Sequence, residues 1–429
     1  MIEKYYSGVI EQIYNRIGKE TRNIVMANYS NDFSIENLEV IRRFQSNEDN
    51  VFFAYSEFSY NTLVGAYEPF LDIICNMHRR FIGGSFDDFQ KECGVYYLHR
   101  QVLNSYYETG ECFREETVLL NEVAYEQRRM TMAIADMLKK LSEVKPLMIV
   151  INRFQMASKS SIETIKYLID NPCANIGIVL GVNAIVKGTD STVEVWDRIV
   201  ESLEDRSAIY YIGSAGPLKN NVKTTNDDEL YITMNFEQSI QEASNIMEFL
   251  DFEQARRGCR IIEHKLKFED AWIDEKSLRR FYMVYARTSV LLGEMSKAIE
   301  LTNEYKALIP ENDSEHYLSL YYFMKGTCYM YQGKLEKAGN SAKSAYDYAV
   351  LAEDDTLIFK AELLSVMIKM SGWYNIFFCV QDIPVSDEII EKLIKHGYRN
   401  HLAHIYIYAY DNSRDVVKQS FYDESLLKH

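Results

Sequence analysis

The chain has 429 residues and a formal net charge of −16, which argues against direct binding to nucleic acid or to an anionic membrane. Hydrophobic residues make up 47% of the sequence, enough for two or three globular cores, yet no apolar run approaches the roughly 18 residues of a membrane span. The seven cysteines are scattered without a CxxC pair, so the sequence favours a reducing cytoplasm over a disulfide or zinc framework.

The N-terminal region has the layout of a phosphate-binding loop. It predicts a helix, an apolar strand and a second helix over residues 1–19, 22–26 and 35–44. In the pattern GxxxxGK[ST], Ala27 and Asp32 replace the two glycines, Phe33 replaces the lysine and only Ser34 agrees. The loop therefore offers phosphate no cation. A carboxylate such as that of Asp32, placed about 4 Å from a phosphate charge, would cost roughly 4 kcal/mol at an effective dielectric of about 20.

Four further apolar runs predict strands, over residues 51–56, 147–151, 175–181 and 208–212. Helical periodicity separates them, over residues 71–81, 117–142, 162–168 and 193–203. Five strands that alternate with helices predict a parallel α/β sheet. The first domain is therefore expected to be an α/β parallel-sheet, P-loop-like domain.

The stretch from Lys145 to Leu168 shows the repeating unit of such a sheet most clearly. Pro146 precedes a short apolar run, Asn152 and Arg153 follow it, and cap residues at 158–161 open a helix. In a doubly wound sheet the ligand lies at the tip of such a strand. Asn152 and Arg153 are therefore candidate site residues.

This stretch resembles the Walker B segment of STAND-class ATPases, found in large LuxR-type transcriptional regulators. Its agreement with the family pattern lies at Pro146, Phe154, Gln155 and Ala157. Asn152 and Arg153 replace the family's two aspartates. The strand that in the family ends near a sensor arginine ends here at Asn183, so that arginine is missing too. The resemblance implies a pseudo-ATPase with no catalytic residue and no cofactor, whose vestigial site would comprise Ala27, Asp32, Phe33, Ser34, Asn152, Arg153 and Asn183. The alternative is a buried strand and helix without nucleotide history.

The second half predicts an all-α, tetratricopeptide-like solenoid. Motifs that join two helices recur with starts near residues 251, 293, 333, 372 and 411, a period of about 40. Glycine at 293 and 333 suits the tight turn, and the alanine that follows allows close helix packing. The expected organisation is an ATPase-like domain, a linker and helical repeats, over residues 1–215, 216–234 and 235–429.

Two residue sets in the repeats could bind a partner or a metal. Tyr317, Tyr321 and Tyr331 share one helix face, which either packs in the core or binds a partner. His401 and His404 are three residues apart, but a metal would need a further ligand on that face, so no metal is expected.

The sequence thus predicts a non-catalytic sensing and scaffolding module of a bacterial, cytoplasmic signalling or transcriptional regulator. A protein or small ligand would bind the helical repeats, and this portion would bind neither nucleic acid nor a membrane. The alternatives are the regulatory part of a diguanylate cyclase or other signalling enzyme, and a residual ATPase. Residues 416–427 keep an apolar stripe, which predicts further repeats or a C-terminal effector beyond His429, such as a LuxR-type helix-turn-helix.

Overall fold

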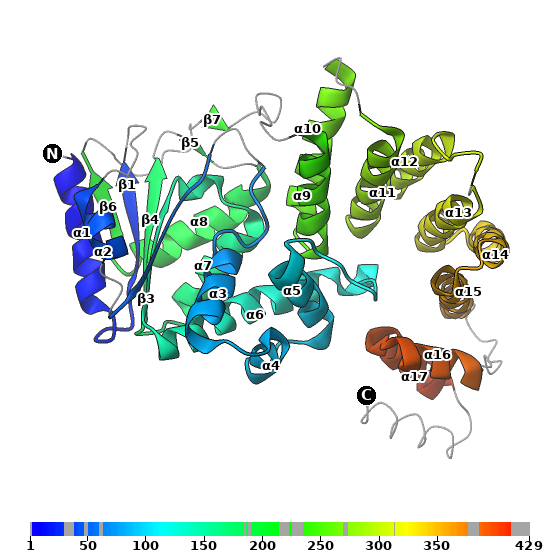
Figure 1. Ribbon diagram of the computed structural model, residues 1–429, viewed down its shortest axis with the longest axis horizontal. Helices are drawn as coiled ribbons and strands as arrows, with labels where there is room; N and C mark the ends of the chain where they lie inside the picture. The colour runs from blue at the N-terminus through cyan, green and yellow to red at the C-terminus, as the bar shows by residue number, and fades with distance from the viewer. Residues whose placement is uncertain are drawn as a thin grey trace. The chain divides into compact units, whose positions relative to one another are not determined.

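A computed structural model describes residues 2–29, 38–46, 50–59, 63–183, 186–187, 190–213, 223–224, 235–268, 273–312, 314–375 and 386–412. The chain divides into two compact units, each described below by itself (Figure 1). The α/β unit comprises Met1–Glu115 and Asn121–Trp272, and the helical unit comprises Glu116–Leu120 and Ile273–His429. The sequence placed a linker at residues 216–234, whereas the two helices after that region belong to the α/β unit.

A five-stranded parallel sheet with the order β2-β3-β4-β1-β6 forms the centre of the α/β unit. Its strands are β1 (Ile24–Tyr29), β2 (Phe52–Glu57), β3 (Leu147–Asn152), β4 (Ile176–Asn183) and β6 (Ile209–Ile212). The prediction of five parallel strands that alternate with helices is confirmed. A separate pair of two-residue strands joins β5 (Val186–Lys187) to β7 (Lys223–Thr224).

Helices cover both faces of this sheet (Figure 1). The helices of this unit, only some of which lie on the sheet, are α1 (Ile2–Arg16), α2 (Glu39–Ser46), α3 (Phe70–Met77), α4 (Phe86–Glu92), α5 (Tyr97–Thr109), α6 (Val123–Val144), α7 (Lys159–Asp170), α8 (Asp190–Glu204), α9 (Phe236–Glu248) and α10 (Phe252–Phe268). Helices α1 and α2 lie against one face, and α7 and α8 against the other. The predicted cap of α7 is confirmed, since the Ser158 side chain accepts the N–H of Ser161.

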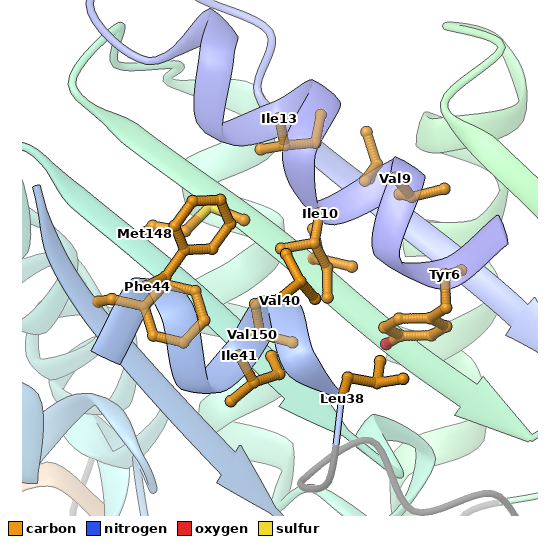
Figure 2. Packing of buried hydrophobic residues seen from close by; sticks show 14 of the residues in the cluster. Tyr6, Val9, Ile10, Ile13, Leu38, Val40, Ile41, Phe44, Met148 and Val150 are labelled. Carbon is orange, nitrogen blue, oxygen red and sulfur yellow. The ribbon is translucent and has the colours of Figure 1, made fainter. Parts of the chain in front are cut away.

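The core beneath α1 and α2 explains why these helices form there. Apolar residues recur along one face of α1 and of α2 and meet alternate residues of the strands (Figure 2). The labelled members are Tyr6, Val9, Ile10, Ile13, Leu38, Val40, Ile41, Phe44, Met148 and Val150. Gly177 of β4 lets α1 approach closely, because an added Cβ would lie 2.8 Å from the Ile17 side chain.

One predicted helix begins later than expected. The sequence predicted a helix over residues 117–142, but α6 begins at Val123, and residues 116–119 are not helical. From Cys112 to Val118 every second residue is buried, as in an extended chain lying on a surface. Residues 116–120 belong to the helical unit. Their packing within that unit overrides the helical periodicity of the sequence.

The helical unit consists of successive helices that pack in pairs. They are α11 (Glu275–Leu291), α12 (Met295–Ala307), α13 (Ser314–Tyr331), α14 (Leu335–Leu351), α15 (Asp355–Asn375), α16 (Asp387–His396) and α17 (Arg399–Asn412). Turns at Gly293 and Gly333 join α11 to α12 and α13 to α14, as predicted. The predicted turn near residue 372 is wrong, because this position lies inside α15. The predicted stripe over residues 416–427 lies outside the described residues.

Among the described residues, no helix has both the length and the apolar character needed to cross a membrane.

Candidate functional site

The carboxyl ends of β1, β3 and β4 carry the predicted site residues that the structure describes. Asn152 is the last residue of β3, Arg153 follows it, and Asn183 is the last residue of β4. Ala27 is fully buried inside β1, so the strand continues three residues beyond the predicted end at Met26. The predicted loop positions Asp32, Phe33 and Ser34 lie outside the described residues.

Tyr29 links the ends of β1 and β3 at this edge of the sheet. Its hydroxyl donates a 2.6 Å hydrogen bond to Oδ1 of Asn152, and both side chains are buried. Strand β4 lies between β1 and β3, so the tyrosine spans two strand spacings, roughly 10 Å. The Asn152 amide therefore already has a hydrogen-bond partner where a magnesium ligand would stand in an ATPase.

Arg153 is held in an uncommon backbone conformation. Its φ of 54° is left-handed, a region that arginine seldom occupies. Its N–H donates to Asn152 Oδ1 at 3.0 Å, and its guanidinium forms a 3.2 Å ion pair with Glu57 at the end of β2. These contacts direct the arginine toward β2 and commit its charge to a carboxylate of the same chain.

Asn183 is fixed through its backbone. Its N–H donates to Oε1 of Gln155 at 3.2 Å, and both residues are buried. Gln155 belongs to the short 3₁₀ turn Phe154–Met156 that follows β3. This glutamine, which carried part of the family resemblance, links the ends of β3 and β4.

Tyr6 of α1 packs against this edge. Its ring meets that of Tyr29 edge-on, with centroids 6.4 Å apart, and it is fully buried. Burial, then the neighbouring Tyr29, Tyr55 and Glu57, raises the pKa of Tyr6 well above its usual value. The low local dielectric that this shift reports would make an unpaired anion or dication costly here.

The residues that the structure describes at this edge are therefore neutral or internally paired. A magnesium site in a nucleotide-binding fold needs carboxylate oxygens, whereas β3 here ends in an amide and a guanidinium. Across the described part of the chain, no group of three or more His, Cys, Asp or Glu side chains is arranged to hold a metal ion. The sequence analysis did not identify Tyr29 or Glu57 as site residues, because neither belongs to a recognisable sequence motif.

The predicted tyrosines of α13 differ in exposure. Tyr321 is only 2% exposed and accepts a 2.7 Å hydrogen bond from Lys325, which supports its packing in the core. Tyr317 and Tyr331 are half-buried. Tyr331 accepts the N–H of Leu120 at 3.2 Å, so it contacts the extended segment within the helical unit.

The other anchor of this segment is Glu116. Its fully buried carboxylate accepts the backbone N–H of His401 at 2.8 Å and lies 2.7 Å from Nδ1 of the same ring. Nδ1 of His401, which was considered above as a metal ligand, thus contacts Glu116. The same carboxylate caps the first turn of α17. The sequence around Glu116 shows no periodic signal that could have revealed this role.

A cavity of about 430 Å³ lies between α6, α7 and α10. Its charged side chains are mostly paired: Lys159 with Glu253 at 3.0 Å, and Lys166 with Asp170 at 2.6 Å. Burial raises the pKa of Asp251, whose carboxylate accepts the Ser160 N–H at the start of α7. These contacts hold α10 against α7, which gives the charges a structural role.

Comparison with known proteins adds no relative to this description. No protein-family model matches the chain, and no curated protein sequence matches it significantly.

Proposed function

We propose that this chain is a non-catalytic sensing and scaffolding module of a cytoplasmic signalling or transcriptional regulator. The observation that carries the proposal is the hydrogen bond between Tyr29 and Asn152, which closes the edge where a nucleotide would lie. The ion pair of Arg153 with Glu57 adds to it, because a carboxylate that could otherwise bind Mg²⁺ is already paired with a guanidinium. The domain would keep a nucleotide-binding architecture as a rigid support.

The sheet itself supports a vestigial ATPase domain. Its order places β1 beside β4, between β4 and β6. The connections from β1 and from β4 leave in opposite directions, so the crevice above their carboxyl ends is the topological switch point where ligands bind in such sheets. Tyr29 and Asn152 occupy that crevice.

The scaffolding half of the proposal rests on the helical unit. This unit holds residues 116–119 in a non-helical conformation, through the contacts of Glu116 with His401 and of the next residue, Leu120, with Tyr331. Tetratricopeptide-like repeats would bind a partner in the same manner, by anchoring an extended segment at a few polar points. The predicted partner residue Tyr331 is one of those points here.

Calorimetric titration of the whole chain with ATP, with and without Mg²⁺, tests the proposal. No magnesium-dependent binding is expected, and the sequence further predicts that Phe33→Lys alone would not restore it, because Asp32 and the lost magnesium ligand remain. Magnesium-dependent binding with micromolar affinity would instead favour the alternative, a residual ATPase. Reading the gene beyond His429 would distinguish a DNA-binding output from a diguanylate cyclase or another signalling enzyme.

A further inference from the structure

A second cavity lies at the opposite, amino-terminal edge of the sheet. Its volume is about 240 Å³, and residues at the ends of α1, α7 and α8 and at the starts of β1 and β6 line it. The side chains that matter are Arg16, Glu20, Arg22 and Arg206. Because β1 begins at this edge and ends at Tyr29, the cavity is separate from the vestigial nucleotide site.

Positive charge gathers in this cavity although the chain as a whole is strongly acidic. Arg16 lies 3.6 Å from Glu20, and Arg206 donates to the carbonyl oxygen of Ile169 at 2.7 Å, which leaves its charge uncompensated by an acid there. Arg22 is exposed and forms no hydrogen bond or ion pair with any residue that the structure describes. Three arginines and one glutamate are thus the charged residues that line the cavity.

The backbone around Arg22 is fixed even though its side chain is free. The neighbouring Asn23 is fully buried, and its Nδ2 donates to the carbonyl oxygens of Glu20 at 2.6 Å and of Ala174 at 3.2 Å. Its own carbonyl oxygen accepts the N–H of Ile178 in β4. Arg22 therefore lies on a well-anchored turn between α1 and β1. Its backbone would lose little conformational entropy when a ligand binds.

A backbone donor adds to the three arginines. Met26 N–H donates to the Ala208 carbonyl oxygen at 3.0 Å, where β1 begins to pair with β6. Ile24 lies two residues earlier on the same strand, so its N–H is directed to the same side, at the wall of the cavity. Guanidinium forks and backbone N–H groups together form a donor set suited to a tetrahedral oxyanion.

The size of the cavity limits the ligand. Pockets for drug-sized molecules measure roughly 300–1,000 Å³, and this one is smaller. We propose that this cavity binds a phosphate group, either inorganic phosphate or the phosphate of a small phosphorylated ligand. The site goes beyond the proposed function, because it depends on the arginines of this edge and not on the state of the nucleotide edge.

Calorimetric titration with inorganic phosphate and with AMP, at constant ionic strength, tests this site on the whole chain. Saturable binding is expected, and Arg22→Gln should weaken it at least about tenfold, because the Arg22 guanidinium pairs with none of the described residues and its charge is available to the phosphate. Arg43→Gln is the matched control: Arg43 is exposed, pairs with Glu11 on α1 and does not line the cavity. Circular dichroism of both variants confirms that they are folded.

The outcomes separate the two sources of phosphate. Tighter binding of AMP than of phosphate supports a phosphorylated ligand, and equal binding supports free phosphate. Absence of saturable binding below about 10 mM, or equal weakening by Arg22→Gln and Arg43→Gln, would overturn the proposal. ATP binding that Arg22→Gln removes belongs to this cavity. ATP binding that needs Mg²⁺ and survives Arg22→Gln contradicts the proposed function instead.

Discussion

The hydroxyl group of Tyr29 links the ends of β1 and β3 through its hydrogen bond to Asn152. Tyr29→Phe removes one donor to Asn152 Oδ1 and leaves the N–H of Arg153 as another. We expect the free energy of unfolding in urea to fall by about 0.5–1.5 kcal/mol, the usual net value of a hydrogen bond. Tyr210→Phe is the control, since that hydroxyl donates to Gln12 at an exposed position and should matter by less than about 0.5 kcal/mol. Equal losses would contradict the role of Tyr29.

Glu242 of α9 should make the stability of the α/β unit depend on pH. It lines a cavity of about 250 Å³ together with Glu68 and Asp72, and Tyr106 donates to Asp72 at 3.0 Å. Burial first, and then Glu68 and Asp72, raises the pKa of Glu242 from 4.5 to about 7. A raised carboxyl pKa means that the folded state holds the proton more tightly than the unfolded state. The contribution of protonated Glu242 to the free energy of unfolding is therefore complete below pH 4.5 and is lost as the pH rises through 7.

Glu242→Gln should therefore raise the melting temperature at pH 8 and have little effect at pH 5. The expected gain in the free energy of unfolding at pH 8 is about 1–3 kcal/mol. Partial solvent screening makes it smaller than the value that the full pKa shift would give. Glu237→Gln, at the exposed start of the same helix, is the matched control and should show no such pH dependence. A gain of equal size at both pH values would rule out proton linkage as its cause.

At the scale of elements, the contact between α13 and α14 depends on small residues. Ala338 is fully buried, and a Cβ added at Gly326 would lie 3.3 Å from the Ser341 side chain. Ala338→Phe should overpack this contact and cost about 1–3 kcal/mol in thermal or urea unfolding. Gly339→Phe provides the control, because Gly339 has open space around it in the same helix. An unchanged stability in Ala338→Phe would show that the two helices can separate without cost.

The elements that sequence reasoning found, and those it missed, differ in a physical way. Fully buried parallel strands are short apolar runs, and helix turns at Gly293 and Gly333 use glycine in the left-handed region, so both leave a sequence signal. The turn between α14 and α15 instead places Glu353 at a φ of 51°, and no glycine marks it. The glycine at residue 372 lies inside α15 and gave a false turn.

The candidate site was predictable only in part. The tips of β3 and β4 follow from the apolar runs, so Asn152, Arg153 and Asn183 could be placed at one edge. The partners Tyr29 and Glu57 could not, because their contacts depend on the strand order and on β1 continuing past Met26. Long-range pairing of this kind has no local periodicity in the sequence.

At the scale of the whole molecule, the five residues Glu116–Leu120 belong to the helical unit although the sequence on both sides of them belongs to the α/β unit. Glu116→Ala removes a buried acceptor for the His401 N–H and ring. We expect a loss of about 1–3 kcal/mol and reduced hydrogen-exchange protection in the first turn of α17. Glu115→Ala, at the exposed neighbouring residue, should leave that protection unchanged. Equal protection in both variants would show that Glu116 does not cap α17.

The place of Glu116 in the chain has a consequence for biosynthesis. Its partner His401 lies 285 residues further along. At a synthesis rate of roughly 5–20 residues per second, about 15–60 s pass between the two residues leaving the ribosome. During that interval Glu116, which is buried in the finished protein, lacks its His401 partner, and until residue 331 is made Leu120 also lacks its Tyr331 partner. The nascent chain therefore carries an incompletely covered segment, with Val118 and Leu119 among its aliphatic residues, that a chaperone could recognise until α17 is made.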